Sequence, residues 1–350
     1  MLKIVFTGGG TAGHIMPNLA IIENLKNCKI YYFGSDGMEK NILSKYKNIT
    51  FVEIPSVKFI RSFTLKNLKI PFKLIKSISY CRKKLEEIKP NLIFSKGGYV
   101  SIPVALAGSK LGINILTHES DLSIGLANKI IARKSKHICC SFKETASKYG
   151  KNSIFTGSPI RKKILQGNKS IIIKRHNIKE NKPIITIVGG SLGAQAINEI
   201  IWNNIEKLTN KYNIIHIVGK GKLKKEYNNK SSYIQIEFAD DIENYFKASD
   251  LVITRAGSNT IFELLAIQKP MILIPLPKKS SRGDQLLNAE IFKKQKFAKV
   301  ILQENLDINT LESTINNTLI NKSTYINNMK QSQNYNGNKK IEELIYIYSK

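Results

Sequence analysis

Two glycine-rich loops in the sequence have the residue types and the spacing to hold phosphate groups. Residues 8–13 (GGGTAG) and residues 189–194 (GGSLGA) each follow an apolar run and precede a segment with helical periodicity. Glycines allow backbone N–H groups to approach an anion closely, and the first turn of the following helix adds about half a positive charge. One such loop, with Asp36 after the next apolar run, would fit a dinucleotide site. Two loops, with the titratable His14 beside the first, favour a protein that binds a nucleotide diphosphate and a second substrate.

The elements that carry these loops are predicted to be parallel strands and the helices that connect them. Short apolar runs alternate with longer segments of helical periodicity, which is typical of parallel sheets covered on both faces. We expect two Rossmann-like domains that face each other across a cleft, residues 1–157 and residues 158–338, with a final helix at residues 339–350 that packs back on the first domain. The runs that we predict as strands are residues 4–7, 30–33, 92–95, 113–117 and 137–141, and then 184–188, 214–218, 233–236, 251–254 and 271–275.

The composition is that of a globular and strongly basic protein. Of the 350 residues, 42% are hydrophobic, and 55 Lys and Arg against 26 Asp and Glu give a net charge of +29. The excess is spread over both halves, without a recognition helix or a cluster of stacking aromatic residues, so we expect no nucleic-acid partner. No apolar run reaches the roughly 18 residues of a membrane span, and the N-terminus lacks the pattern of a signal peptide. The body of the protein is therefore expected in the cytosol.

No pattern in the sequence predicts a metal site, a cofactor or a disulfide. No Asp-x-Asp triplet occurs, so phosphate charge is expected to be neutralised by arginine and helix N-termini instead of a metal. The cysteines form no C-x-x-C pair, and we expect them to be small apolar residues of the interior. They are Cys28, Cys81, Cys139 and Cys140.

Seven motifs in order along the chain are more specific than these general patterns. They are residues 8–17 (GGGTAGHIMP), 96–101 (KGGYVS), 118–121 (HESD), 157–161 (GSPIR), 189–194 (GGSLGA), 255–263 (RAGSNTIFE) and 284–289 (DQLLNA). Together they resemble the motifs of the MurG family, whose members add N-acetylglucosamine (GlcNAc) to lipid I in peptidoglycan synthesis.

The resemblance implies a two-domain GT-B fold and an inverting hexosyltransferase. Its donor would be UDP-GlcNAc, and its acceptor would be undecaprenyl-pyrophosphoryl-MurNAc-pentapeptide (lipid I), with a β-1,4 linkage in the product, lipid II. Three positions depart from the family's pattern. Asp121 stands where the frequent H-E-Q-N motif has an amide, Asp284 stands where many members have glutamine, and Ala239 replaces the isoleucine near the uracil. These departures concern the sugar and base contacts, and not the diphosphate and ribose contacts.

The resemblance places the donor mainly on the second domain. Arg161 would neutralise the departing pyrophosphate with a bidentate guanidinium, and Glu263 would accept hydrogen bonds from the ribose hydroxyls. From the residues alone, Glu263 is equally well explained as a carboxylate that caps its helix, and Asp284 and Gln285 as caps of the helix that follows Gly283. The residues expected to bind UDP-GlcNAc are Thr11, Ala12, Gly13, His14, Arg161, Ser191, Ala239, Glu263, Asp284 and Gln285.

Inversion by direct attack requires one general base and no glycosyl-enzyme intermediate. His14 is the first candidate because imidazole titrates in the appropriate range. Asp121 and Glu119 are the alternatives, and Glu119 is equally well suited to orienting a backbone loop. The residues expected to hold the pyrophosphate of the acceptor, at a helix start, are Gly97, Gly98 and Tyr99.

Residues 61–89 combine apolar side chains with a high density of lysine and arginine. The pattern is typical of a helix that lies on an anionic bilayer, where each basic group contributes about 1 kcal/mol. The alternative is a helix packed on the first sheet with a solvated lysine face. Because the acceptor would be a polyprenyl lipid, we expect peripheral association with the cytoplasmic face of the cell membrane. Other proteins of cell-wall synthesis are further candidate partners.

Three other functions remain open from the sequence. A related GT-B transferase could use another lipid acceptor, as a diglucosyl-lipid synthase does. A non-catalytic subunit could bind a nucleotide sugar and recruit a membrane partner, although binding alone requires neither His14 nor Arg161. An NAD-dependent oxidoreductase is the most distant alternative.

Overall fold

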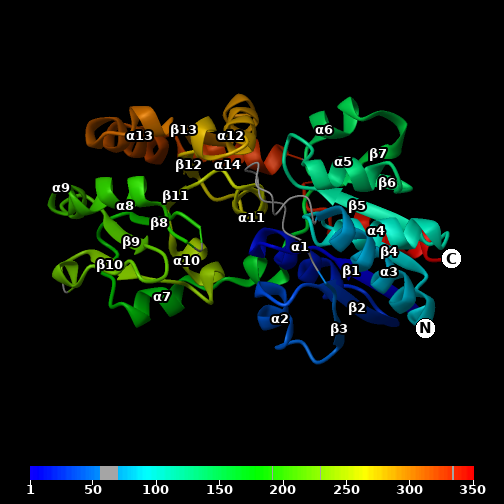
Figure 1. The fold of residues 1–350 in the computed structure, drawn as a ribbon. Coiled ribbons are helices and arrows are strands. Elements are labelled where there is room, and N and C mark those ends of the chain that lie inside the picture. The colour runs from blue at the N-terminus through cyan, green and yellow to red at the C-terminus, as the bar shows by residue number, and fades with distance from the viewer. Residues whose placement is uncertain (56–69, 191, 229, 333–334) are drawn as a thin grey trace. The chain divides into compact units, whose positions relative to one another are not determined.

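The computed structural model describes residues 1–55, 70–190, 192–228, 230–332 and 335–350, and the chain separates into two compact units. The first unit comprises Met1–Arg161 and Asn334–Lys350, and the second comprises Lys162–Gln333. Each unit contains one parallel sheet with helices on both faces (Figure 1). The expected class, α/β with two parallel sheets, is confirmed.

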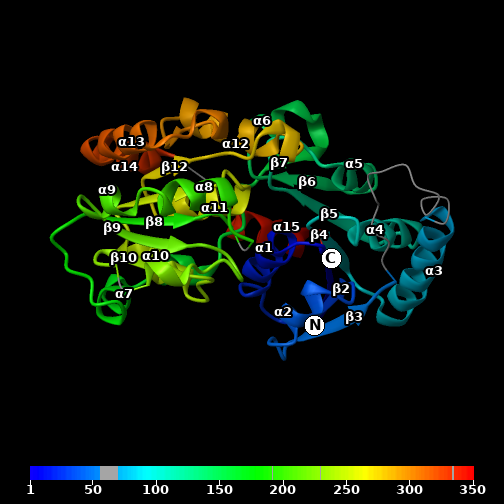
Figure 2. The same ribbon diagram turned by 60° about the vertical axis from the view of Figure 1, so that its left-hand side comes forward.

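The first sheet has seven strands in the order β3-β2-β1-β4-β5-β6-β7. Its strands are β1 (Leu2–Thr7), β2 (Cys28–Gly34), β3 (Ile49–Glu53), β4 (Leu92–Ser95), β5 (Asn114–Glu119), β6 (His137–Cys140) and β7 (Ser153–Phe155). The helices of this unit are α1 (Ala12–Ile22), α2 (Met38–Leu43), α3 (Ile70–Ile88), α4 (Ser101–Lys110), α5 (Leu126–Ala132), α6 (Lys143–Lys148) and α15 (Asn338–Tyr348), with a 3-10 turn at Gly150–Asn152. Helix α3 lies against α4 (Figure 2).

Alternate residues of the first sheet's strands enter two separate cores. In β1, Ile4 and Phe6 pack with the buried Ile341 and Ile345 of α15 on one face, whereas Val5 packs on the opposite face in the core that contains α3 and α4. Side chains of successive strand residues point to opposite faces, so a strand covered on both sides is apolar throughout. This explains why β1 appears in the sequence as a continuous apolar run.

The second sheet has six strands in the order β10-β9-β8-β11-β12-β13. Its strands are β8 (Ile184–Val188), β9 (Asn213–Ile217), β10 (Tyr233–Ile236), β11 (Leu251–Thr254), β12 (Met271–Leu273) and β13 (Ala298–Val300). The helices are α7 (Lys169–Arg175), α8 (Gln195–Trp202), α9 (Ile205–Thr209), α10 (Ile242–Ala248), α11 (Ser258–Ala266), α12 (Asp284–Lys294), α13 (Ile308–Ile320) and α14 (Lys322–Gln331). Short 3-10 turns occur at Lys162–Gln166, Lys225–Tyr227, Lys278–Ser280 and Gln303–Asn305.

Strands β3, β7 and β13 were not among the predicted apolar runs. Each forms an edge of its sheet, and most of their residues are only partly buried. An edge strand has one neighbour and less cover, so its sequence needs fewer apolar residues. The periodicity of the chain alone therefore does not mark these three strands.

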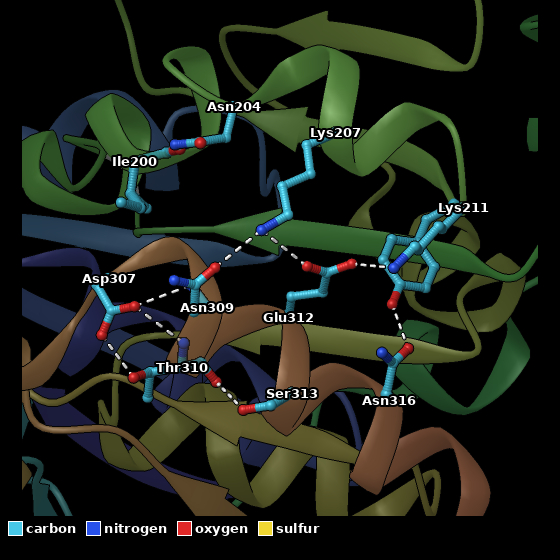
Figure 3. A network of polar contacts seen from close by, with 11 residues as sticks. Ile200, Asn204, Lys207, Lys211, Asp307, Asn309, Thr310, Glu312, Ser313 and Asn316 are labelled. Atoms are coloured by element: carbon cyan, nitrogen blue, oxygen red, sulfur yellow. Dashed lines mark hydrogen bonds and ion pairs between the residues drawn. The ribbon is translucent and has the colours of Figure 1, made fainter.

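A polar network joins α9 to α13 in the second unit (Figure 3). Glu312 accepts from Lys207 (3.1 Å) and from Lys211. Asp307 caps α13 by accepting from the backbone N–H groups of Asn309 (2.8 Å) and Thr310 (3.0 Å). These contacts hold α13 in place, where its inner face contributes to the core under the sheet.

The division between the units lies after Arg161 because the residues before it pair with the returning chain. Gly337 N–H donates to the Ser158 carbonyl (2.8 Å), and the Asn338 side chain bonds the backbone N–H and carbonyl of Ile160 (2.9 and 2.7 Å). The expected boundary at residue 157 thus precedes the observed division. The expected second domain ended at residue 338, inside α15 of the first unit. Arg161 likewise belongs to the first unit.

Candidate functional site

The strand order reverses at one point in each sheet, and the glycine-rich loops lie there. In the first sheet, β1 lies between β2 and β4, and residues 8–11 and 96–100 follow β1 and β4. In the second sheet, β8 lies between β9 and β11, and residues 189–194 and 255–257 follow β8 and β11. Ligands of doubly wound sheets bind at the carboxyl ends of strands at such a reversal. Each unit therefore has a candidate ligand site of its own at its strand reversal.

In the first unit, the loops after β1 and β4 are in direct contact. A Cβ atom on Gly98 (φ +82°) would lie 2.6 Å from the Gly9 carbonyl oxygen and 3.5 Å from the His14 ring. A Cβ atom on Gly10 (φ +85°) would lie 2.8 Å from the Tyr99 ring. Both glycines have left-handed backbone conformations that side chains disfavour. The fold thus brings together the predicted residues His14, Gly98 and Tyr99.

The His14 ring is held within its own loop. Helix α1 begins at Ala12, and His14 is half-buried while Thr11 and Gly13 are exposed. Nδ1 of His14 lies 3.0 Å from the Thr11 hydroxyl. Because this contact engages one ring nitrogen locally, it orients the imidazole beside Gly98.

A buried carboxylate that the sequence analysis missed occupies the glycine loop. Oε1 of Glu39 (1% exposed) accepts from the Gly10 N–H (2.9 Å) and from the Ser35 hydroxyl (3.1 Å). A Cβ atom on Gly9 would collide with the same carboxylate. Asp36, the residue considered for a dinucleotide site, instead forms an ion pair with Lys40 (3.1 Å) at the surface. Because the Glu39 carboxylate already accepts from the Gly10 N–H, this position is unfavourable for a dinucleotide phosphate.

A cavity of about 400 Å³ opens beside this carboxylate. Its walls come from the loop after β2, the start of α2, the end of β3, and the loops after β1 and β4. They include Gly10, Asp36, Glu39, Glu53 and Tyr99. The cavity therefore lies beside the point where the loops after β1 and β4 touch, because Gly10 and Tyr99 line it.

Glu119 at the end of β5 orients the loop that follows it. Its carboxylate accepts from the backbone N–H groups of Asp121 (3.0 Å) and Gly125 (3.0 Å), and from the Asn128 side chain (2.9 Å). Burial raises the pKa of Glu119, and the neighbouring charge of Asp121 acts in the same direction. Asn128, also missed in the sequence, touches the loop after β4, because a Cβ atom on Gly97 would lie 2.5 Å from its Oδ1. Glu119 therefore has the contacts of a loop-orienting residue.

In the second unit, the loop after β8 packs directly on the chain after β9. A Cβ atom on Gly193 (φ +69°) would collide with the Val218 carbonyl oxygen. That carbonyl accepts from Asn198 Nδ2 (2.8 Å), and Asn198 Oδ1 lies 3.0 Å from His216 Nε2. Burial lowers the pKa of His216 to about 3, so the imidazole is neutral and Nε2–H donates to Asn198. Ser191, the expected diphosphate contact, lies outside the described residues.

Glu263 lies in the second turn of α11 and is 6% exposed. The helix begins at Ser258 and has no acidic residue in its first turn, which contradicts the capping alternative for Glu263. Arg255, which starts the same motif, is also buried, and it donates to the Ile274 carbonyl (3.0 Å) and to Gln303 Oε1 (2.7 Å). Arg255 thus connects neighbouring segments, whereas Glu263 is a buried carboxylate without a capping role.

The remaining donor candidates lie on other elements of the second unit. Gln285 in the first turn of α12 accepts from the Leu276 N–H (3.0 Å), and Asp284 forms an ion pair with Arg282 (3.5 Å). The Gln285 contact ties α12 to the segment after β12. Ala239 lies between β10 and α10 and packs on the apolar cluster beneath α10.

Within the described residues, no three His, Cys, Asp or Glu side chains are grouped as metal ligands would be. Asp241, near Ala239, pairs with Arg175 (2.7 Å). Among the residues that the structure describes, every helix is too short or too polar to span a bilayer.

Comparison with known proteins places both halves of the chain in one enzyme family. Residues 4–140 match the model of the glycosyltransferase family 28 N-terminal domain, and residues 184–345 match that of the C-terminal domain.

Individual relatives are similar over their full length. A UDP-N-acetylglucosamine–N-acetylmuramyl-(pentapeptide) pyrophosphoryl-undecaprenol N-acetylglucosamine transferase of Clostridium botulinum (strain Loch Maree / Type A3) is 45% identical over 355 residues, which cover 100% of both chains. A transferase of the same description from Bacillus thuringiensis (strain Al Hakam) is 44% identical, over 100% of this chain and 99% of its own. The crystal structure of MurG from Acinetobacter baumannii superimposes with a TM-score of 0.77 at 24% identity, over 99% of this chain and 100% of that one. The fold is therefore of the GT-B type.

Proposed function

The chain belongs to glycosyltransferase family 28, within the MurG family of UDP-GlcNAc transferases, and on this premise we propose that it converts lipid I to lipid II. GlcNAc would pass from UDP-GlcNAc to the muramyl sugar of undecaprenyl-pyrophosphoryl-MurNAc-pentapeptide, with inversion and a β-1,4 linkage. The observation that carries this proposal is the 45% identity over the whole length of a transferase with that substrate description. The site geometry is compatible with it, because each unit has a glycine-rich loop at its strand reversal.

We assign the donor mainly to the second unit. The loop at residues 189–194, including Ser191, would hold the diphosphate through backbone N–H groups at the start of α8. Glu263 would accept the two ribose hydroxyls, and its burial within α11 supports this role because the carboxylate is not used to cap the helix. Backbone amide groups near Ala239 would form the hydrogen bonds that recognise the uracil. Gln285 and Asp284 would contact the sugar.

We assign further donor contacts to the first unit, where Arg161 would balance the leaving pyrophosphate. The loop residues that would also contact UDP-GlcNAc are Thr11, Ala12, Gly13 and His14. The acceptor's own pyrophosphate would lie at Gly97, Gly98 and Tyr99.

His14 is our candidate for the general base. Its ring lies beside Gly98 and is oriented by the Thr11 hydroxyl, which leaves Nε2 as the basic nitrogen when Thr11 accepts from Nδ1–H. The attacking hydroxyl would transfer its proton to Nε2 as the new bond to the anomeric carbon forms and the bond to UDP breaks. Asp121 is the alternative base, and Glu119 would act as a loop-orienting residue.

We further propose that α3 mediates peripheral contact with an anionic membrane. Phe72 and Ile75 are 76% and 64% exposed on this helix, next to Lys73 and Lys76. Exposed aromatic and aliphatic side chains between lysines suit the interfacial region of a bilayer. The preceding part of the amphipathic segment, residues 61–69, lies outside the described residues.

Incubation with labelled UDP-GlcNAc and a lipid I analogue tests the reaction directly. Formation of a disaccharide-linked lipid is expected. Binding of UDP-GlcNAc without transfer would instead favour a non-catalytic subunit, and transfer only to another lipid would favour a related transferase.

Calorimetric titration with UDP-GlcNAc tests the donor site separately. Glu263→Ala should weaken binding by roughly 10- to 100-fold, because a charged acceptor contributes about 1.5–3 kcal/mol to its hydrogen bonds. Glu290→Ala, which removes an exposed carboxylate from α12, is the matched control and should bind normally. Equal affinities of the two variants would remove Glu263 from the ribose site.

A further inference from the structure

The first unit contains a buried lysine for which the proposed reaction has not yet given a role. Lys96 follows β4 and precedes Gly97, and only 2% of its surface is exposed. Its Nζ contacts the hydroxyl of Ser120, in the loop after β5. A Cβ atom on Gly8 would lie 2.9 Å from the Lys96 Cβ, so the lysine also lies against the loop after β1. Lys96 therefore lies in contact with the loops after β1 and β5 as well as in its own loop after β4.

The charges around Lys96 explain how an ammonium group is kept there. Burial alone would cost several kcal/mol for an unpaired ion. It lowers the pKa of Lys96 to about 8, while the negative charges of Glu119 and Asp121 oppose this shift. The pKa of His118 is well below its usual value because of burial and the charge of Lys96, so this imidazole adds no second cation. The lysine is thus cationic near neutral pH, and the negative charges of two carboxylates act on it.

The two carboxylates are not equivalent partners. Glu119 accepts three hydrogen bonds that hold the loop from Asp121 to Asn128, so its carboxylate already has N–H donors as partners. Asp121 is joined to the lysine in two ways. Its neighbour Ser120 contacts the ammonium group directly, and its own charge acts on that group. Any displacement of Lys96 would therefore move Asp121 and change the charge around it.

We propose that Lys96 is a positioning residue for Asp121, which it holds at the acceptor site through Ser120 and whose carboxylate charge it balances. The inference rests on the proposed transferase function and adds a charge-matched pair to it. In this arrangement the Asp121 carboxylate can accept a hydrogen bond from a sugar hydroxyl of the acceptor. Because the charge of Asp121 acts on Lys96, the effects of removing the two charges should not be independent.

A double-mutant cycle with Lys96→Met, Asp121→Asn and the combined variant tests this pairing. Methionine keeps the linear shape of lysine without its charge, and asparagine keeps the shape of aspartate. Each single variant should lower kcat with a lipid I analogue about tenfold or more and leave KM for UDP-GlcNAc within about twofold. Coupled residues deviate from additivity by about 0.5–3 kcal/mol, so the combined variant should retain roughly 2- to 150-fold more activity than the product of the single effects.

Lys269→Met is the control, because Lys269 is a partly buried lysine of the second unit whose Nζ contacts the Ser249 carbonyl and whose pKa burial also lowers to about 8. The effect of Lys269→Met on kcat should simply multiply with the effect of Asp121→Asn. Urea unfolding of all variants separates the alternatives. If the two substitutions are coupled in the free energy of unfolding but their effects on kcat simply multiply, Lys96 has only a structural role and the proposal is wrong. If the wild-type protein transfers GlcNAc and the two effects on kcat multiply, the proposal is likewise wrong, while the proposed function stands. A wild-type protein that transfers no GlcNAc would remove the function and this inference together.

Discussion

Substitution of Gly98 by alanine tests whether the contact between the loops after β1 and β4 forms the acceptor site. Gly98 has a φ of +82°, and a Cβ atom there would lie 2.6 Å from the Gly9 carbonyl oxygen. Gly112 has a similar φ of +72°, but no atom lies within 4 Å of the corresponding Cβ position. Gly112→Ala therefore reproduces the backbone strain of Gly98→Ala without the collision.

The expected magnitudes follow from these two geometries. Left-handed backbone costs an alanine about 1–2 kcal/mol, so Gly112→Ala should lower the free energy of unfolding by about that amount. Gly98→Ala adds an overpacked contact between two backbones, which costs about 1–3 kcal/mol more. If the loops separate to relieve the collision, the His14 ring moves away from the acceptor cradle. Transfer to a lipid I analogue should then fall by at least tenfold in Gly98→Ala and remain near the wild-type rate in Gly112→Ala.

Hydrogen–deuterium exchange and transfer kinetics measure the two effects on the same samples. Peptides from residues 8–14 and 97–101 should exchange faster in Gly98→Ala than in Gly112→Ala. UDP-GlcNAc affinity should change less than the transfer rate, because most of the proposed donor residues lie on the other unit. Equal unfolding free energies, exchange rates and transfer rates in the two variants would refute the assignment of this contact to the acceptor site.

Three further substitutions test His14, the exposed side of α3 and the buried histidine of the second unit. His14→Ala should lower kcat by about 10²- to 10⁴-fold with little change in UDP-GlcNAc affinity, as loss of a general base does. Phe72→Asp combined with Lys73→Glu should abolish flotation with anionic vesicles. His216→Gln should flatten the acid dependence of unfolding. The folded pKa of about 3 lies below the unfolded value of about 6.5, so stability is complete above pH 6.5 and falls by about 1.4 kcal/mol per unit between these values. Urea titrations from pH 7 to pH 4, followed by fluorescence of Trp202, the single tryptophan, should show this slope in the wild type only.

Each of these predictions has a distinct contradicting result. Unchanged turnover of His14→Ala would transfer the base role to Asp121. Ile320→Asp combined with Lys330→Glu makes the same charge change on exposed residues of the second unit and should float normally. Flotation of the α3 variant as well would restore the packed-helix explanation. Identical pH slopes for the wild type and His216→Gln would mean that the imidazole has the same pKa in the folded and the unfolded protein.

The sequence alone determined the two α/β units, the central strands and the position of the glycine-rich loops. These features are local, because burial on both faces imposes a continuous apolar run and close backbone approach requires glycine within a few residues. The seven ordered motifs added the family and with it the donor and acceptor. The edge strands β3, β7 and β13 lacked this local signal because one side of each has no neighbouring strand.

The tertiary structure alone decided which distant side chains meet at the strand reversals. Glu39 reaches the Gly10 N–H because β2 lies beside β1, and Lys96 reaches Ser120 because β5 lies beside β4. In the sequence these residues are an ordinary surface-type glutamate and lysine. Their burial depends on the order of strands in the sheet, which places the carboxyl ends of segments far apart in the chain at one edge. No local periodicity carries that information.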